Sequence, residues 1–512
     1  MHWLLLSLII ISTAVLVRRC MEFLKMYYTT SSLHGPKSYP FIGCIQLETH
    51  SEKLFQQFVD ACTTWTEPRM FLFWFFTKPV VVIHGAEEAE ALLTTNLDKS
   101  WDYKYFQPWM GEGLLLSKTK EWKLQRRQLQ PCFHSEVLDK FIPTCNIVAR
   151  RLVDNIDADA VSDRKINICP YIKLCALEMI CDTLLGQDVC QHKVECADYL
   201  QALETMHSII GQRMLTPWLW PNIVYRFSGI QKRFIKALSQ CNKFIAKIIQ
   251  SRIENRSINN RPTNIDKRTR MPFLDFLIAQ MEQAESAEKD ILNQINTFMV
   301  GGHESTAASM CWTLQLIGEH PEIEERLHQE IIHVFGDSDK NATKEDLTAL
   351  VYLDQVIKES LRLYPTIPLN GRILNNDLKI KGYCLPAGTM VSVFLYGLHR
   401  DPLYFPNPNL FNPDRFCRDF DLTNGTAKHP YSYLPFSGGP RNCIGQRFAL
   451  LEQKVVLSWI LRRFRVRSCQ TRNDIKVKFQ VVLKPESPDL SSVEAKDVAL
   501  LSNTVGANKS CI

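Results

Sequence analysis

The feature that most constrains this chain is a glycine-rich loop that carries one cysteine, Cys443, just before an apolar helical pattern. Residues 436–447 read Phe-Ser-Gly-Gly-Pro-Arg-Asn-Cys-Ile-Gly-Gln-Arg. Gly438 and Gly439 permit tight turns and leave room for a flat cofactor close to the backbone. The free N–H groups at a helix start favour a thiolate, and Arg441 adds positive charge. The loop therefore predicts a thiolate ligand, and a buried structural cysteine is the alternative interpretation.

The composition is that of an ordinary globular protein and argues against several classes. Of the 512 residues, 46% are hydrophobic and 22% are charged. A chain of this length forms about two to four domains or one large enzyme. The net charge of +6 is small, and there is no arginine-rich arm, so nucleic-acid binding is not expected. The 17 cysteines include no Cys-x-x-Cys pair, which is typical of reduced thiols in a cytosol-facing protein rather than of a zinc ribbon.

The amino terminus has the pattern of a membrane anchor. Residues 3–17 contain no charge and are followed at once by Arg18 and Arg19. A cleaved signal peptide, the alternative, needs its positive charge before the apolar run and a small-residue cleavage site after it. We therefore expect a signal anchor over 1–25, with the amino terminus in the lumen and the body in the cytosol. A proline-marked, turn-rich hinge is expected over 26–44.

The hydrophobic pattern predicts a mainly α-helical fold with a small β portion. Helical patterns dominate from 52 to about 250 and from about 285 to 365. Gly, Pro, Asn and Asp crowd residues 370–432, which predicts a coil-rich meander with short strands. The remaining expectations are strands at 70–76, 80–84 and 476–483, a solvated basic linker at 251–270 and a disordered tail at 491–512.

A second candidate site lies in the helical pattern 297–307. Gly301, Glu304 and Ser305 stand at i, i+3 and i+4, so we expect them to share one face. Paired glycines inside a helix cost about 1 kcal/mol each, which suggests that a flat cofactor uses the space they leave. An acid beside a hydroxyl can relay protons, and Thr306 adds a second hydroxyl. The alternative is a glycine-kinked core helix with a solvent-facing Glu304.

Two further segments bring charged side chains into helical register. Glu359 and Arg362 lie one turn apart beside leucines and Pro365, which favours a buried ion pair over a surface pair. Trp122 and Arg126 stand at i and i+4, so both can reach one anionic group. A basic amphipathic helix is the alternative for this second pair.

Together these motifs resemble those of the cytochromes P450. The cysteine loop matches every fixed position of Phe-x-x-Gly-x-Arg-x-Cys-x-Gly. The glycine helix, the Glu-x-x-Arg pair and the Trp-x-x-x-Arg pair are similar to three further motifs of that family, with Ser305 in place of the usual threonine. The resemblance extends from about residue 34 to 485. It implies a cytochrome P450 fold, with a haem-thiolate domain over 45–490.

The resemblance also implies roles for individual residues. It makes Cys443 the axial ligand of the iron in haem b, which is otherwise held without a covalent bond. Family 4 of the superfamily, which the chain most resembles, typically has a glutamate that can become ester-linked to haem where this chain has Gly301. The remaining implied roles are propionate binding for Trp122, Arg126, Arg372 and Arg441, proton delivery for Glu304, Ser305 and Thr306, and scaffolding of the haem pocket for Glu359, Arg362 and Arg415.

The implied function is a monooxygenase of the endoplasmic reticulum membrane. It would insert one oxygen atom from O2 into a lipid-like substrate such as a fatty acid, hormone or xenobiotic. Electrons would come from NADPH through NADPH–cytochrome P450 reductase, with cytochrome b5 as a further partner. The basic residues expected to dock the reductase are Lys118, Lys120, Lys123 and Arg127. Two alternatives remain: an isomerase or dehydratase of the same fold, and a non-catalytic haem-binding relative.

Overall fold

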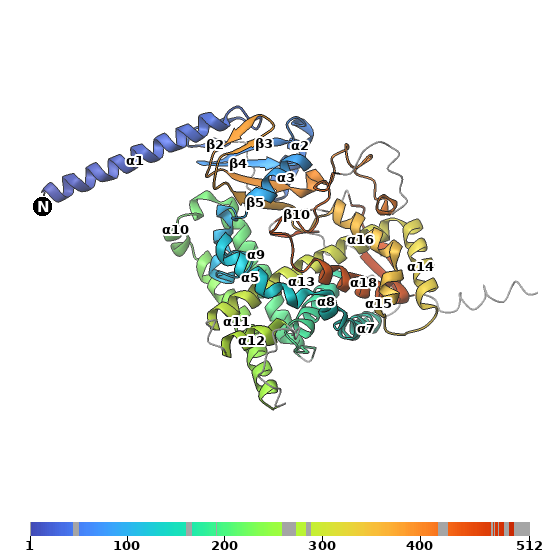
Figure 1. The fold of residues 1–512 in the computed structure, drawn as a ribbon. Coiled ribbons are helices and arrows are strands. Elements are labelled where there is room, and N and C mark those ends of the chain that lie inside the picture. The colour runs from blue at the N-terminus through green and yellow to red at the C-terminus, as the bar shows by residue number, and fades with distance from the viewer. Residues whose placement is uncertain are drawn as a thin grey trace, which may run out of the picture.

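The fold is a large helical body with a small sheet at one end, as the sequence predicted (Figure 1). The computed structural model describes residues 2–44, 51–159, 166–190, 192–258, 273–282, 288–417, 429–472, 475, 477–479, 481–485 and 491–495. Helix α1 (His2–Thr30) extends away from the body beside the sheet.

The helices and strands follow in this order. The further α-helices are α2 Ser51–Thr64, α3 Ala86–Thr95, α4 Gln107–Met110, α5 Thr119–Leu129, α6 Ser135–Asp139, α7 Ile142–Asp159, α8 Cys169–Thr183, α9 Lys193–Leu215, α10 Asn222–Phe227, α11 Ile230–Ile258, α12 Phe273–Glu282, α13 Glu288–Glu319, α14 Pro321–Phe335, α15 Lys344–Ala349, α16 Val351–Leu363, α17 Leu395–Leu398 and α18 Gln446–Arg463. Short 3-10 helices are η1 Trp101–Tyr105, η2 Gln130–Phe133, η3 Pro217–Leu219 and η4 Pro413–Phe416. The strands are β1 Ser38–Tyr39, β2 Gly43–Cys44, β3 Met70–Phe75, β4 Lys78–Ile83, β5 Leu369–Ile373, β6 Leu378–Ile380, β7 Tyr383–Leu385, β8 Met390–Phe394, β9 Phe464–Ser468, β10 Val477–Phe479, β11 Leu483–Pro485 and β12 Ser491–Ala495.

The main sheet joins two distant parts of the chain. Its strand order is β1-β2-β3-β4-β8-β5, and only the β4–β8 pair is parallel. The apolar runs at 70–76 and 80–84 form strands β3 and β4, as the sequence predicted, because β-branched and aromatic side chains pack well on a pleated surface, and the two strands pair antiparallel. Strand β5 pairs with β8 and places Arg372 opposite Val391. The coil-rich segment predicted at 370–432 thus places Arg372, in β5, next to the helical body.

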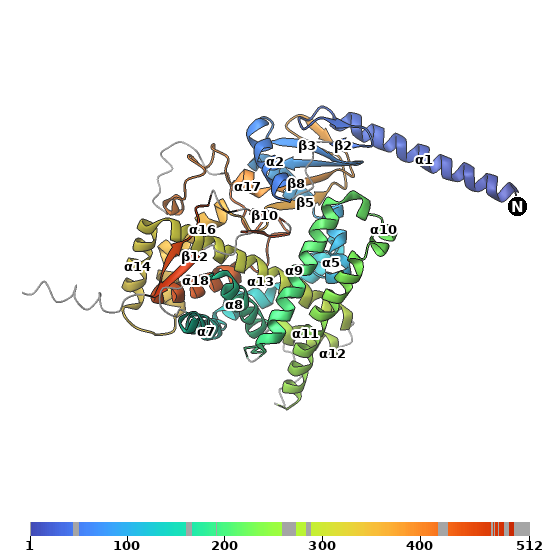
Figure 2. The ribbon, with the colours of Figure 1, turned by 180° about the vertical axis from the view of Figure 1, so that it is seen from behind.

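Helix α13 forms the centre of the body. Its side chains are buried on nearly every side from Ile291 to Ile317, and the buried set includes polar residues such as Asn296, Glu304 and Gln315. Both views show α13 crossing the molecule among α8, α16 and α18 (Figures 1 and 2). The glycine pair of the sequence analysis therefore lies in the most enclosed helix of the fold.

Several sequence-based boundaries were wrong. Helix α1 runs to Thr30, so the expected hinge over 26–44 begins with helix. Helix α11 continues to Ile258 and takes the first part of the expected linker, whose residues 259–270 lie outside the described part of the chain. Residues 491–495, assigned to a disordered tail, form β12 and pair with β9. Backbone pairing with an available strand edge outweighs the polar composition of that segment.

The described residues include no helix that meets the length and apolarity required to cross a membrane.

Candidate functional site

The loop of Cys443 is built by close contact with helix α3. The backbone N–H of Cys443 donates to the carbonyl of Phe436 at 2.9 Å, and α18 begins at Gln446. Gly439 has φ 70°, and a Cβ there would lie 2.3 Å from the carbonyl oxygen of Leu93. The room left by this glycine is therefore used by the protein's own backbone, rather than by a cofactor as the sequence suggested. The loop is held so that the free thiol of Cys443 is accessible.

The electrostatics of the thiol differ from the expectation. Although the thiol of Cys443 is accessible, the protein atoms that surround it on several sides reduce its solvation and raise its pKa, while the backbone N–H of Gly445 and the Arg126 guanidinium lower it. The cation that acts on the sulfur is thus Arg126 of α5, whose guanidinium binds the carbonyl and the side chain of Asn442 at 2.8 and 3.0 Å. Arg441, which the sequence placed beside the thiol, instead binds the carbonyls of Leu97 and Ser117.

Helix α13 presents a small, open face. A Cβ on Gly301 would meet nothing within 4 Å, whereas one on Gly302 would lie 2.4 Å from Ile180 of α8. One turn after Gly301, the Ser305 hydroxyl donates to the Gly301 carbonyl at 2.6 Å. The two glycines thus serve different needs: Gly302 permits helix packing, and Gly301 keeps a half-exposed face clear next to a hydroxyl.

Glu304 stands one turn from Gly301, as the spacing predicts, but unlike Gly301 it is buried and its carboxylate has partners of its own. Its carboxylate lies 3.0 Å from the Lys484 ammonium of β11 and 2.6 Å from Nδ1 of His207 on α9. The His207 contact is short, but it does not have the geometry of a hydrogen bond. These partners hold the pKa of Glu304 well below its usual range although burial acts in the opposite direction. Thr306 is buried and has no hydrogen-bond partner for its hydroxyl among the described residues.

Two buried arginines and a half-buried lysine gather near the cysteine loop. Arg372 is fully buried, and only its Nη1 has partners: the Asn370 side chain and the Gly371 carbonyl. Its Nε and Nη2 atoms have none in the described part of the chain. Lys99 forms an antiparallel bridge with Arg372, and its ammonium reaches Asn370 at 3.4 Å. We call Lys99, Arg372 and Arg441 the cation cluster.

The cation cluster has no compensating carboxylate of its own. No described carboxylate forms an ion pair with any of its members. Burial and the like charge of Arg372 lower the pKa of Arg441 to about 10, against a weaker opposite effect of Asp98, which lies beyond ion-pair distance. Burial, Arg372 and Arg441 together place the pKa of Lys99 well below its usual range, against a weaker opposite effect of Asp102. Buried N–H donors without acceptors are costly, so the cluster fits an anionic ligand.

The residues of the predicted propionate set are brought together only in part. Trp122 is buried on α5, and the guanidinium of Arg441 lies 4.9 Å from its ring centre. Arg126 is on the same helix but contacts Asn442. Sequence reasoning missed Lys99, Lys484 and His207, because nothing in the pattern around them indicates that they meet residues up to 280 positions away.

The ion network near η4 has the arrangement that the sequence suggested. Arg362 binds Glu359 through Nε at 2.7 Å and Nη2 at 2.8 Å. Arg415 lies 3.3 Å from the same carboxylate. The backbone N–H of Asn412 also donates to Glu359 at 2.9 Å. This network ties α16 to the segment that precedes the cysteine loop.

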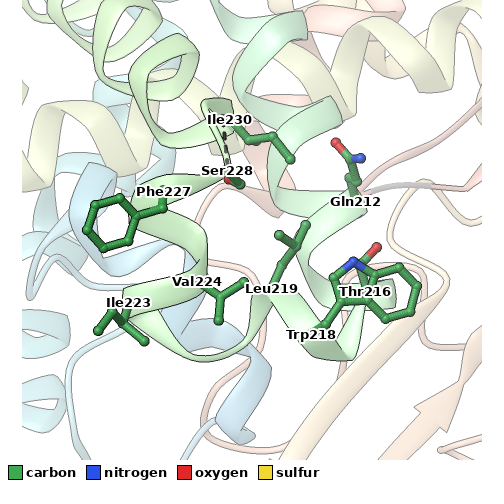
Figure 3. A pocket seen from close by; sticks show the side chains of 9 residues that line it. All are labelled: Gln212, Thr216, Trp218, Leu219, Ile223, Val224, Phe227, Ser228 and Ile230. Carbon is green, nitrogen blue, oxygen red and sulfur yellow. Dashed lines mark hydrogen bonds between the residues drawn. The ribbon is translucent and has the colours of Figure 1, made fainter.

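The surface has two notable hollows away from this network. The larger, of about 720 Å³, lies among α9, η3, α10 and α11 and is lined by apolar side chains (Figure 3). None of its lining residues belongs to α13 or to the cysteine loop, so it is not the cofactor site. Phe227 and Trp218 in it are 82% and 64% exposed. A second hollow, of about 530 Å³, is lined by Lys123, Arg126 and Arg127 and their neighbours.

These residues fit a flat, anionic, iron-bearing cofactor. An accessible thiol suits the iron, and the unpartnered guanidinium N–H groups of Arg372 suit carboxylates. Gly301 leaves space beside Ser305 for the reacting groups.

Comparison with known proteins places most of the chain beside one family. The cytochrome P450 family model matches residues 33–492. Cytochrome P450 4V2 of Homo sapiens is 36% identical over 462 residues, which is 88% of this chain and 87% of that protein. Cytochrome P450 4c21 of Blattella germanica is 36% identical over 477 residues, covering 90% and 93%. Cytochrome P450 4c3 of Drosophila melanogaster is 34% identical over 474 residues, covering 88% and 87%. The residues matched by the family model include the cysteine loop, α13 and the cation cluster.

Proposed function

Because the chain belongs to the cytochrome P450 family and is a haem-thiolate monooxygenase, we propose that Cys443 is the axial ligand of its haem iron. The observation that carries this proposal is the accessible free thiol in a rigid loop directly before α18. When bound, the haem supplies the activation of dioxygen, and one oxygen atom enters a hydrophobic substrate. Arg126 and the Gly445 N–H favour the thiolate form that iron requires.

The haem propionates are assigned to the buried cations. Arg372 and Arg441 supply guanidinium donors, and we add Lys99 to the predicted set because it lies beside Arg372 without an acid of its own. Trp122 and Arg126 hold this side of the pocket by supporting Arg441 and the loop at Asn442. Glu359, Arg362 and Arg415 act as a scaffold, since their contacts are with one another and with backbone carbonyls.

The proton supply is assigned to α13. Ser305 lies on the open face beside Gly301, so its hydroxyl is placed to pass a proton to the reacting oxygen. Glu304 is the acid that supplies this hydroxyl, after its carboxylate has taken up a proton. Thr306 is buried and supports the helix at this turn.

Attachment to the endoplasmic reticulum membrane is assigned to α1, with the catalytic body in the cytosol. Apolar side chains of α1 such as Ile9, Ile11 and Leu16 are exposed by 60%, 61% and 68%. Helix α10, with its apolar hollow, lies on the same side of the molecule as α1 (Figures 1 and 2). Both surfaces suit contact with lipid.

The electron source is NADPH through NADPH–cytochrome P450 reductase, with cytochrome b5 as a second partner. The basic hollow at Lys123 and Arg127 shares Arg126 with the contact to Asn442, the neighbour of Cys443. An acidic protein docked there would stand close to the thiolate side of the cofactor. The substrate class is a lipid-like molecule, as the resemblance to family 4 implies.

The reduced carbon monoxide complex tests the ligand directly. The parent protein should show the Soret band of a haem thiolate, and Cys443→Ser should lose it; a mutant that keeps it has another cysteine as the ligand. Turnover of a lipid panel with reductase should consume NADPH and yield hydroxylated product. Product formed without NADPH would indicate an isomerase or dehydratase. Absence of both product and NADPH consumption would indicate a haem-binding protein without activity. Haem should separate fully from the denatured chain, because Gly301 offers no carboxylate for an ester.

A further inference from the structure

The carboxylate of Glu304 shares its cation with a second carboxylate closer to the surface. The Lys484 ammonium lies 3.0 Å from Glu304 and 2.6 Å from Glu204 of α9. The Glu304 and Lys484 side chains are each 9% exposed, whereas that of Glu204 is 41% exposed. Lys484 therefore stands between a buried acid and a half-exposed acid.

We infer that Lys484 is a positioning residue for Glu304, and that its movement onto Glu204 alone lets Glu304 take up a proton from solvent. Lys484 remains an ammonium in both positions, and the added proton binds one carboxylate oxygen of Glu304. This inference rests on the proposed role of Glu304 in proton supply. It adds the residue that decides when that acid carries a proton.

The charge balance explains why Lys484 can act in this way. Burial alone would raise the pKa of Glu304, and the nearby cationic groups reverse that effect. The same two carboxylates raise the pKa of Lys484, so a direct proton transfer from the lysine to Glu304 is unfavourable. His207 and Lys484 both lower the pKa of Glu304, so departure of the ammonium removes one of two cationic influences and favours protonation, because a buried carboxylate with less compensating charge is costly.

The other groups around Glu304 have less freedom. His207 is 1% exposed and contacts Glu304 from α9, but no second acid among the described residues competes for it. Lys484 alone has two acceptors on different elements. The titratable groups that face this site are Tyr199, Glu204 and His207 of α9, Lys484 of β11, His303 of α13 and Lys173 of α8.

Infrared spectroscopy of the holoenzyme tests, without turnover, whether Lys484 keeps the carboxylate of Glu304 deprotonated. At neutral pH the parent should lack the carbonyl band of a buried protonated carboxylic acid at this site. Lys484→Met should show that band, and Lys484→Met combined with Glu304→Gln should lose it again. Lys484→Arg, which keeps the charge, should resemble the parent. If folded Lys484→Met lacks the band, His207 alone holds the carboxylate and the inference is wrong.

Turnover then tests the sharing of Lys484. Glu204→Gln removes the competing acceptor, so Lys484 should stay on Glu304 and product formed per NADPH should fall severalfold, with hydrogen peroxide in its place. Substrate affinity should not change, because Glu204 holds no substrate in this scheme. Parent-like coupling in Glu204→Gln would overturn the inference. The infrared measurement does not depend on turnover. Failure of the inference on Lys484 can therefore be distinguished from failure of the proposed proton supply by Glu304.

Discussion

Arg362 and Arg372 are both fully buried and stand ten residues apart in the chain, yet their surroundings are opposite. Arg362 uses its N–H groups on Glu359 and on the carbonyls of His399, Pro408 and Leu410. Among the described residues, Arg372 has partners only at Nη1, and it has Lys99 and Arg441 as neighbours of like charge. The N–H groups of Arg362 therefore have their hydrogen-bond partners within the protein, whereas those of Arg372 have no anionic partner among the described residues.

This difference separates a structural charge from a binding charge. A buried arginine whose donors are all paired contributes to the fold and has little left for a ligand. A buried arginine with unpaired donors among other cations destabilises the protein until an anion arrives. We therefore expect substitutions at the two positions to have opposite effects on the protein without haem.

The largest effect is expected for Arg362→Met. The substitution leaves the buried Glu359 carboxylate with Arg415 as its remaining cation and removes the donors of three carbonyls. The free energy of unfolding should fall by about 3–5 kcal/mol, as for other broken buried ion pairs. Denaturant titration followed by circular dichroism measures this.

The matched control is Arg463→Met at the end of α18. Its pair with Asp157 is half exposed, so the loss should be under about 1 kcal/mol. Equal midpoints for Arg362→Met and the parent would show that the Glu359 network is not the scaffold assigned to it.

The second effect concerns Arg372→Met. The free energy of unfolding of the haem-free protein should stay unchanged or rise, because Lys99 and Arg441 lose a like charge. Haem affinity should fall about 10- to 100-fold, since a hydrogen bond to a charged group contributes about 1.5–3 kcal/mol. Soret titration of the haem-free protein measures the affinity.

Haem dimethyl ester sharpens this test. It lacks both propionate charges but keeps the iron, so the parent and Arg372→Met should bind it equally. A difference of the same size with the ester would mean that Arg372 shapes the pocket rather than binding a propionate, and the contrast with Arg362 would fail.

The sequence predicted the groups that local spacing brings together. The cysteine loop, the Glu359–Arg362 pair and the strands at 70–76 and 80–84 lie within single segments, so periodicity and glycine placement were sufficient. For Glu304, helical spacing indicates the position one turn from Gly301, but it does not indicate that the carboxylate meets Lys484 and His207 from distant segments. Tertiary charge partners are not visible in a one-turn pattern.

The cation cluster shows the same limit more strongly. Arg372 was found only through its place after a proline segment, and Lys99 was not found at all. The two meet through a backbone bridge between segments 273 residues apart. No local pattern reports such a pairing, and the excess of positive charge becomes visible only when the fold is assembled.

The smallest effect on haem affinity is expected for substitutions of Lys99. This residue is the member of the cation cluster whose charge changes with pH. The pKa of Lys99 lies well below its usual range in the haem-free protein, because burial, Arg372 and Arg441 oppose its charge. A propionate beside it should raise that pKa, so haem binding should take up a proton. Affinity should then decrease as pH rises through the interval between the two values. Measuring affinity against pH for the parent and for Lys99→Met isolates this effect, because the opposite proton release from Cys443 is common to both.

Lys99→Met should lose this pH dependence and bind haem about three- to tenfold more weakly at neutral pH, in line with a net hydrogen bond of about 0.5–1.5 kcal/mol. The loss is smaller than for Arg372, because part of the interaction energy in the parent is used to protonate the amine. Lys99→Arg should also lose the pH dependence but should keep the affinity, since an arginine stays charged. If all three proteins have the same pH profile, Lys99 does not contact a propionate. The contrast between paired and unpaired cations would then rest on Arg372 and Arg441 alone.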